Sequence, residues 1–409
     1  MTSPPSLLGY CTNVHAGTSL VSVLDNLRTH AMGVRERLQA EQLGIGLWFS
    51  ESAATEILAT GQDDRIRREI ESMGLVPYTF NGFPQGDFHT SVVKHRVYQP
   101  TWWEPSRAQY TRQLIQIMDR LLPAGMRGSI STLPIAWGSP LPSNEQFTQA
   151  ASQLLEIASE LQQLEDRTGR RIVIAIEPEP GCSCTDSVSL RHFFERYLSP
   201  PAIPSDAAEM ARRYLTVCHD VCHAAVMGEE QSHEFREYHR HGIRIGKIQV
   251  SSAIAVPWHR FSASERVEAR QQLEQFAEDR YLHQTMVCFP DGRQQLFEDL
   301  PLILSDPRLQ VGNWRIHFHV PIFIEAWGQL HSTQDEILKL IALWKSEGLG
   351  LDPATEIHVE VETYAWGVLP PALRAMSLQE GIAKELQWLR LQWESTEPLS
   401  HQKSYQQEG

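Results

Sequence analysis

Short runs of apolar residues alternate along the chain with longer segments in which apolar residues recur every three or four positions. The most continuous run covers residues 172–176, which are mostly β-branched. Such a run is typical of a strand that is buried on both faces of a parallel sheet. The clearest helical pattern covers residues 143–168, and Gly169 provides its end. Strand and helix patterns alternate in this way eight times.

Eight alternating pairs predict a (β/α)8 barrel, the TIM-barrel fold class, as a single domain over residues 1–393. An open doubly wound sheet is disfavoured because no glycine-rich phosphate turn follows an early strand. The expected barrel strands cover residues 7–15, 44–49, 75–80, 128–133, 172–176, 215–220, 243–250 and 357–362.

The alternation breaks between the seventh and eighth strands. Residues 281–300 have no regular pattern, and residues 314–320 form a ninth strand pattern that an eight-stranded barrel cannot use. We therefore expect a long insertion at about 252–331, which forms a lid near the barrel mouth and delivers His319 and His283 toward it. The polar residues 394–409 are expected to form a flexible tail.

Several of the expected strands end on charged residues. Glu177 follows the run at 172–176, Asp220 ends the sixth strand, Glu362 ends the eighth, and His223 follows Asp220 by three residues. A buried carboxylate is costly without a partner, and active sites of parallel barrels lie at the carboxyl ends of the strands. Three carboxylates and a histidine at successive strand ends therefore predict a site for a divalent metal.

Composition narrows the classes of function. The chain has 409 residues, 42% of them hydrophobic, and a formal net charge of -14 with scattered Lys and Arg. A nucleic-acid partner or an anionic membrane surface is therefore not expected. We find no signal-peptide pattern and no apolar run of membrane-spanning length, so no membrane insertion is expected. The 6 cysteines are too few for a disulfide scaffold, and we expect a cytoplasmic location.

The strand-end motifs resemble those of the xylose-isomerase-like barrels, a superfamily of sugar isomerases, epimerases and endonuclease-IV-type enzymes. Within it, five phrases resemble the branch called metabolite traffic protein EboE: GYCTNVH at 9–15, IEPEPGC at 176–182, KIQVSSA at 247–253, HFHVP at 317–321 and HVEVETY at 358–364. That branch belongs to a gene set implicated in exporting natural-product precursors. The resemblance implies a small-molecule metabolite as ligand, and other proteins of the same traffic pathway as possible partners.

The resemblance also implies a metal held by two Glu, one Asp and one His. Glu177, Asp220 and Glu362 match, but Gln249 stands where the family has His. Gln249 offers a neutral oxygen that suits magnesium or manganese, and His319 is the alternative fourth ligand, which would also suit zinc. The implied reaction is proton abstraction next to a carbonyl, with Glu177 and Glu362 as acid and base and His223 on a substrate oxygen.

The residues that would complete a substrate pocket are Asn13 and His15 after the first strand, His283 from the insertion, and Trp137 and Trp366 as apolar walls. Two alternatives stay open. Cys218 and Cys222 with Cys182 or Cys184 can form a structural zinc site. The protein can also be a non-catalytic carrier of a hydrophobic or aromatic metabolite destined for export.

Overall fold

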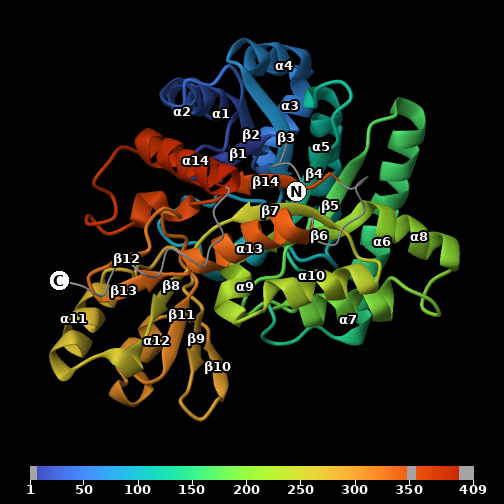
Figure 1. Cartoon of the computed structure of the whole chain (residues 1–409). Helices are drawn as coiled ribbons and strands as arrows, with labels where there is room; N and C mark the ends of the chain where they lie inside the picture. The colour runs from blue at the N-terminus through green and yellow to red at the C-terminus, as the bar shows by residue number, and fades with distance from the viewer. Residues whose placement is uncertain (1–6, 348–355, 396–409) are drawn as a thin grey trace.

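Eight parallel strands close into a barrel at the centre of the molecule (Figure 1). The computed structural model describes residues 7–347 and 356–395, so almost all of the predicted tail at 394–409 lies outside the described residues. The neighbour order is β1-β14-β7-β6-β5-β4-β3-β2, which confirms the predicted (β/α)8 barrel. The barrel strands are β1 (Leu8–Cys11), β2 (Leu43–Trp48), β3 (Leu75–Asn81), β4 (Gly128–Thr132), β5 (Ile172–Ile176), β6 (Leu215–Asp220), β7 (Ile245–Val250) and β14 (His358–Val361).

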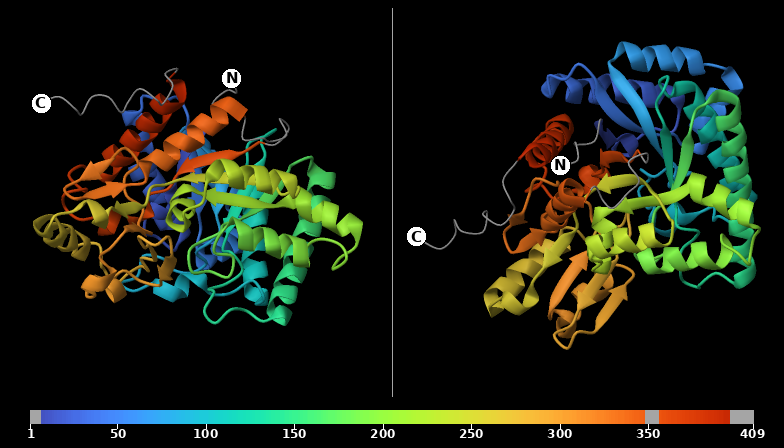
Figure 2. Two further views of the ribbon diagram at one scale, coloured as in Figure 1. Left: turned by 60° about the horizontal axis from the view of Figure 1, so that its bottom comes forward. Right: turned by 45° about the vertical axis from the view of Figure 1, so that its right-hand side comes forward.

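Helices surround the barrel and bury its outer face (Figure 2). The longest, α6, begins with a capping box between Ser143 and Gln146 and ends at Gly169, whose φ is 71°. A left-handed φ favours glycine because it has no Cβ, so the sequence indicated this helix end correctly. The helices are α1 (Leu20–Asn26), α2 (Met32–Arg37), α3 (Glu51–Thr60), α4 (Asp63–Ser72), α5 (Pro105–Leu121), α6 (Asn144–Thr168), α7 (Ser187–Tyr197), α8 (Ser205–Tyr214), α9 (Val221–Met227), α10 (Gln231–Arg240), α11 (Ala263–Glu274), α12 (Pro301–Leu304), α13 (Gln334–Glu347) and α14 (Leu378–Glu394), with a π-helical turn, Leu27–Ala31, between α1 and α2.

A second sheet lies between β7 and β14 in the sequence and to one side of the barrel in space (Figures 1 and 2). Its six strands are antiparallel in the order β10-β9-β11-β8-β13-β12, and its core includes Trp258, Trp314 and Phe318. The strands are β8 (Ile254–Val256), β9 (Thr285–Cys288), β10 (Gln294–Phe297), β11 (Asn313–Ile316), β12 (Ala326–Trp327) and β13 (Leu330–Ser332).

Two expectations about the insertion differ from the structure. The irregular conformation expected at 281–300 is wrong, because β9 and β10 pair as an antiparallel hairpin there. The strand expected at 314–320 ends at Ile316, so His317 and His319 belong to the segment that follows β11. A role of the insertion as a lid stays a prediction.

The interior of the barrel contains a buried ion pair below the mouth. Lys247 of β7 lies 2.7 Å from Glu360 of β14, and both side chains are fully buried. Gly46 of β2 faces this carboxylate, and a Cβ there would collide with the Glu360 side chain. The close approach therefore requires glycine at this position. Among the described residues, no helix has both the length and the apolar character needed to cross a membrane.

Candidate active site and metal centre

The carboxyl ends of four neighbouring strands place their polar side chains at one point of the barrel mouth. Glu177 follows β5, Asp220 ends β6, Gln249 lies in β7 and Glu362 follows β14. The register pairs Asp220 with Gln249 across β6 and β7. Oxygen atoms of Glu177, Asp220 and Glu362 all lie within 4.8 Å of one another, and all three residues are buried.

The amide of Gln249 lies among these three carboxylates. Its Nε2 donates to Glu177 Oε1 at 2.8 Å, to Glu362 Oε2 at 2.7 Å and to Asp220 Oδ2 at 3.2 Å. An amide nitrogen has only two protons, so it cannot donate a full hydrogen bond to all three carboxylates at once. Gln249 Oε1 and Glu177 Oε2 are buried without a hydrogen-bond partner. Rotation of the amide would bring Oε1 to the carboxylates, an arrangement that needs a cation or a protonated carboxyl group between these oxygens.

Burial and mutual repulsion separate the pKa values of the carboxyl groups. Desolvation and the charges of Glu362 and Asp220 raise the pKa of Glu177 well above its ordinary value. Desolvation and the charges of Asp220 and Glu360 likewise raise the pKa of Glu362 well above its ordinary value. Desolvation also opposes ionisation of Asp220, but His223, His319 and a hydrogen bond from Ser251 lower its pKa to about 2. A divalent cation is the counter-charge that would allow all three to ionise together.

His319 comes from the inserted segment and faces the same point. Its Nδ1 donates to the backbone oxygen of Glu362 at 2.8 Å, and its Nε2 lies 3.9 Å from Asp220 Oδ2. Because a carbonyl only accepts, the proton of the neutral ring lies on Nδ1, and Nε2 has a free lone pair. This is the tautomer that binds a metal through Nε2. This Nε2 is buried without a hydrogen-bond partner. Burial lowers the pKa of His319 to about 4, so the ring is neutral.

Two further sets of potential ligands adjoin the three carboxylates, and one of these sets shares Asp220. Asp220, His223 and His319 form one set, and Glu179, His223 and His317 form another. His223 Nδ1 faces the carbonyl of Pro178 at 2.9 Å, and its Nε2 lies 3.1 Å from His317 Nε2. His317 Nδ1 faces Gln284 Oε1 at 2.7 Å. Because both Nδ1 atoms donate to oxygen, the two Nε2 atoms require a shared proton or a cation between them.

These residues fit a divalent metal. Three partnerless buried atoms, Glu177 Oε2, Gln249 Oε1 and His319 Nε2, belong to side chains that meet at the carboxylate group. Buried polar atoms without partners are rare in folded proteins, and a coordinated ion is one way to satisfy them. Carboxylate and amide oxygens with one imidazole suit manganese, magnesium or zinc.

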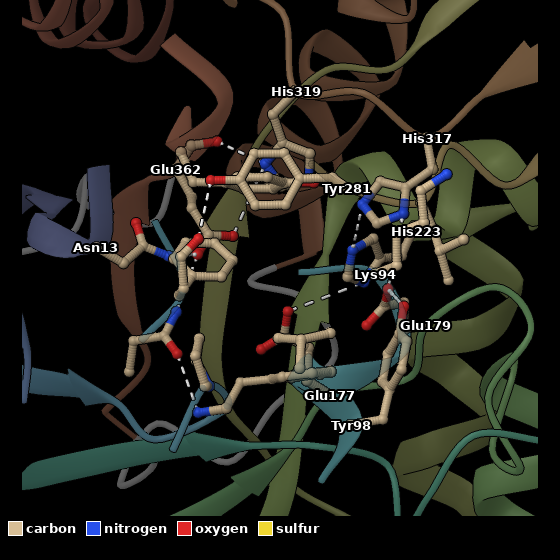
Figure 3. A pocket seen from close by; sticks show the side chains of 17 residues that line it. Asn13, Lys94, Tyr98, Glu177, Glu179, His223, Tyr281, His317, His319 and Glu362 are labelled. Carbon is tan, nitrogen blue, oxygen red and sulfur yellow. Dashed lines mark hydrogen bonds and ion pairs between the residues drawn. The ribbon is translucent and has the colours of Figure 1, made fainter. Parts of the chain in front are cut away.

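The cavity above this group has an aromatic wall (Figure 3). Phe88, Tyr281 and Tyr364 contact one another with ring centroids 5.1 to 5.4 Å apart. Lys94 stands at the cavity and pairs with Asp299 at 2.6 Å. The cavity has a volume of about 60 Å³, well below the ~300 Å³ at the lower end for ligand pockets. A ring-sized ligand therefore enters only if part of the wall moves.

The cavity is lined by some of the predicted site residues and not by others. Glu177, Glu362, His223, His319 and Asn13 line it, and Asn13 Nδ2 donates to Glu362 Oε1 at 2.7 Å. Asp220 and Gln249 lie beneath these residues, within the ligand group and its hydrogen bonds.

Four residues predicted to bind substrate lie outside the lining of this cavity. His15 contacts Tyr10 OH at 2.9 Å and stacks on His30. His283 lies 3.2 Å from Glu278. Trp137 packs on Tyr98 and His95, beside a different surface hollow. Trp366 is buried against Gly381 of α14. Each of these side chains has its contacts outside the cavity lining, and their contact with substrate stays a prediction.

Sequence reasoning missed several polar residues that line the cavity. They include Glu179, Tyr98 and His317, and also Lys94 and Asn81, whose Nδ2 donates to Glu362 Oε1 at 2.9 Å. Glu179 Oε1 accepts from Tyr98 OH at 2.7 Å and from Gln284 Nε2 at 3.1 Å. The Glu177-Pro-Glu179-Pro phrase was a usable signal, because a turn with prolines can direct both carboxylates into the mouth. His317, two residues before His319, was a second signal. Tyr98 lies in a 3-10 helix, Lys94–Tyr98, and its sequence context carried no signal.

The alternative zinc site built from several cysteines has no support in the part of the chain that the structure describes. All four cysteines considered for it are buried free thiols. Cys222 does occur in a potential ligand group, but with His317 and His319 rather than with another cysteine.

No protein-family model matches the chain, and no curated protein matches it either. Solved structures are similar in fold. The xylose isomerase domain protein of Planctomyces limnophilus is 11% identical, with 96% of this chain and 98% of that chain covered and a TM-score of 0.48. The 3-keto-D-glucoside 4-epimerase of E. coli is 11% identical over 94% and 98%, with a TM-score of 0.44. The IOLI protein, whose structure contains a zinc atom, is 11% identical over 94% and 96%, with a TM-score of 0.46. At this identity the likeness concerns the fold alone.

Proposed function

We propose that the protein is a metal-dependent enzyme of the sugar isomerase or epimerase type, which acts on a small carbonyl or polyol-type metabolite by proton transfer between carboxylates. The observation that carries the proposal is the convergence of three buried carboxylates, the Gln249 amide and the unpartnered His319 Nε2 beneath one cavity. A structural role does not account for three crowded carboxylates, because their repulsion destabilises the fold.

Glu177, Asp220, Gln249, Glu362 and His319 would hold the cation, which would polarise the substrate carbonyl when bound. Glu177 and Glu362 would exchange the proton: one removes it from the carbon next to the carbonyl, and the other returns it. His223, anchored through Nδ1 to Pro178, would donate to or accept from a substrate oxygen. The aromatic wall of Phe88, Tyr281 and Tyr364 would exclude water and contact the apolar face of a ring.

The test is incorporation of solvent deuterium into a panel of keto-sugars and polyol-derived ketones, with manganese or magnesium present. Glu177→Gln and Glu362→Gln keep the shape and remove the charge, so each should lower metal content and reduce exchange at least ~10²-fold. Glu71→Gln on α4 is the matched control, because Glu71 is an exposed partner of Arg67. Its exchange rate should equal that of the unmodified protein.

The contrary result is clear. If the unmodified protein exchanges no deuterium across the panel but is recovered with a tightly bound metabolite, the carrier hypothesis replaces the enzyme. The proposed place in a natural-product traffic pathway, and partners from that pathway, depend on the resemblance to the EboE branch and need a pull-down of their own.

A further inference from the structure

A second cavity, of about 280 Å³, opens at the opposite end of the barrel from the candidate active site. It is lined by residues at the starts of β4, β5, β6, β7 and β14, which is the amino-terminal face of the barrel. In TIM barrels this face usually has a structural role. The cavity is only slightly smaller than the ~300 Å³ at which small-molecule pockets begin, so it suits a small ligand.

The walls of this cavity combine small and larger side chains of the barrel strands. Gly128, Thr216 and Gly246 line it together with Val173, Ile245 and His358. Gly246 is required by close packing, because a Cβ there would collide with Thr216 and Val173.

Four arginines, Arg127, Arg171, Arg213 and Arg244, line this cavity in a protein whose net charge is -14. Their concentration opposes the overall charge and creates a local positive potential. Glu356 is the carboxylate among the described lining residues, and it lies exposed.

Glu165 holds two of these arginines side by side. Its Oε1 accepts from Arg171 Nη2 at 3.0 Å and from Arg213 Nη2 at 2.8 Å, and Tyr214 OH donates to its Oε2 at 2.8 Å. Partial desolvation opposes its ionisation, but these hydrogen bonds lower the pKa of Glu165 to about 2. One carboxylate thus positions two guanidinium groups and leaves an excess of positive charge.

Two further groups at the cavity have unused hydrogen-bonding capacity. Among the described residues, the Arg244 side chain has no hydrogen-bond or ion-pair partner. His358 is 5% exposed; its Nδ1 contacts Ser129 Oγ at 2.8 Å, and its Nε2 has no partner. The Arg244 guanidinium is therefore the group that remains available to a polar ligand in the cavity, whereas His358 Nε2 is itself enclosed by protein.

We propose that this cavity binds a phosphate group, either as inorganic phosphate or as the phosphate of a small monoester. The planar guanidinium fork matches two phosphate oxygens at once, which is why arginine predominates in phosphate sites. The site is separate from the candidate active site, because the Lys247–Glu360 layer of the barrel interior lies between them.

The experiment is isothermal titration of the full chain with inorganic phosphate, glycerol 1-phosphate and glycerol at constant ionic strength. Arg244→Gln should weaken phosphate binding at least ~10-fold, and Arg244→Lys should give an intermediate loss, because lysine keeps the charge without the fork. Arg308→Gln is the matched control, since the Arg308 side chain is 88% exposed and belongs to the insertion between β7 and β14. Its affinity should not change.

Equal affinities for the two phosphates would identify a terminal phosphate as the ligand, and tighter binding of the ester would identify a phosphorylated metabolite. No saturable binding up to about 10 mM, or the same affinity in Arg244→Gln, would overturn the proposal. A measurement on the unmodified protein is independent of whether variants fold: phosphate should slow modification of Arg244, but not Arg308, by phenylglyoxal. Equal rates with and without phosphate would also overturn it.

Discussion

Gln249 is the residue on which the metal preference of the site depends. Its amide contacts Glu177, Asp220 and Glu362 at once, at the position where an ion would have its counter-charges. An amide oxygen is a weak ligand for transition metals, whereas an imidazole is a strong one. Compared with a histidine at this position, Gln249 therefore shifts the preference toward magnesium or manganese, because it leaves His319 as the single imidazole among the proposed ligands.

Gln249→His should raise the affinity for zinc by at least ~10-fold relative to magnesium. Gln249→Leu, which keeps the approximate volume but has no ligand atom, should lower the affinity for every divalent metal. Competition titrations with a chromophoric chelator measure both effects. Unchanged zinc affinity in Gln249→His would mean that Gln249 does not face the ion.

Glu385 predicts a pH dependence of stability that is separate from the metal site. It is fully buried and accepts hydrogen bonds from Thr363 Oγ1 at 2.6 Å and the Ile322 amide at 3.1 Å. Desolvation outweighs these bonds and raises its pKa from 4.5 to about 7. Between pH 4.5 and 7 the folded protein holds a proton that the unfolded chain has lost, so stability falls as the pH rises.

Glu385→Gln should remove this pH dependence. The variant should gain up to ~3 kcal/mol relative to the natural protein on going from pH 4.5 to pH 8, because it has no carboxylate to ionise. Urea unfolding at several pH values measures the difference. A constant difference across this range would show that Glu385 is not protonated in the folded state.

Among the elements, β7 and β14 are joined by more than their backbone ladder. Burial disfavours the charge of Lys247, but Glu360 outweighs this effect and raises the pKa of Lys247. The ammonium also contacts Ser131 Oγ at 3.1 Å and the Phe80 carbonyl at 3.3 Å, so one side chain connects β7, β14, β4 and β3.

Lys247→Met should lower the free energy of unfolding by ~3–5 kcal/mol, because it leaves the Glu360 carboxylate buried and unpaired. The double variant Lys247→Met with Glu360→Gln should recover most of this loss. Breaking the exposed pair of Arg67 and Glu71 by Arg67→Gln should change the free energy of unfolding very little, because solvent screens the pair. Chemical denaturation measures all three, and an equal loss in the single and double variants would contradict the argument.

The sequence predicted the barrel elements well because their signals are local. A buried parallel strand such as β5 has a continuous apolar run, and α6 has a complete period with capping residues at both ends. The strands β9, β10 and β12 have two to four residues each. Strands this short contain too few alternating positions for a local pattern to predict them, although β10 and β12 pair with their sequence neighbours β9 and β13.

The candidate site was predictable where its residues lie at strand ends, and not where they lie in loops. Carboxyl ends of adjacent strands meet in any parallel barrel, so Glu177, Asp220, Gln249 and Glu362 followed from the strand assignments. Loops do not obey such a rule, and this is why Tyr98 was missed and why Trp137 and Trp366 were expected in the cavity. The direction of a loop side chain depends on packing that only the structure shows.

At the scale of the whole molecule, both the barrel and the insertion between β7 and β14 contribute residues to the candidate site. The barrel supplies the carboxylates, while the segment after β11 supplies His317 and His319. Tyr281, from the same insertion, forms part of the cavity wall. Because the cavity is too small for a ring-sized ligand, movement of the insertion is the simplest route by which a ligand enters.

A bound cation should therefore hold the insertion against the barrel. At a manganese concentration of about 100 times Kd, ligand binding stabilises the bound state by ~2.7 kcal/mol, which corresponds to a ~100-fold slowing of amide exchange wherever opening breaks the site. We expect this slowing at residues 317–324, and no slowing of the local exchange of α4, which lies on the far side of the barrel (Figure 1). Hydrogen exchange with mass spectrometry measures both segments.

His319→Ala separates this coupling from general stabilisation by the metal. The carboxylates of Glu177, Asp220 and Glu362 remain in the variant, so it should still bind manganese, although more weakly. At manganese concentrations matched to its own Kd, residues 317–324 should lose most of the protection because the insertion no longer contributes a ligand. If the variant retained the full protection of the natural protein, His319 would not connect the insertion to the ion, and the predicted lid would have to close by packing alone.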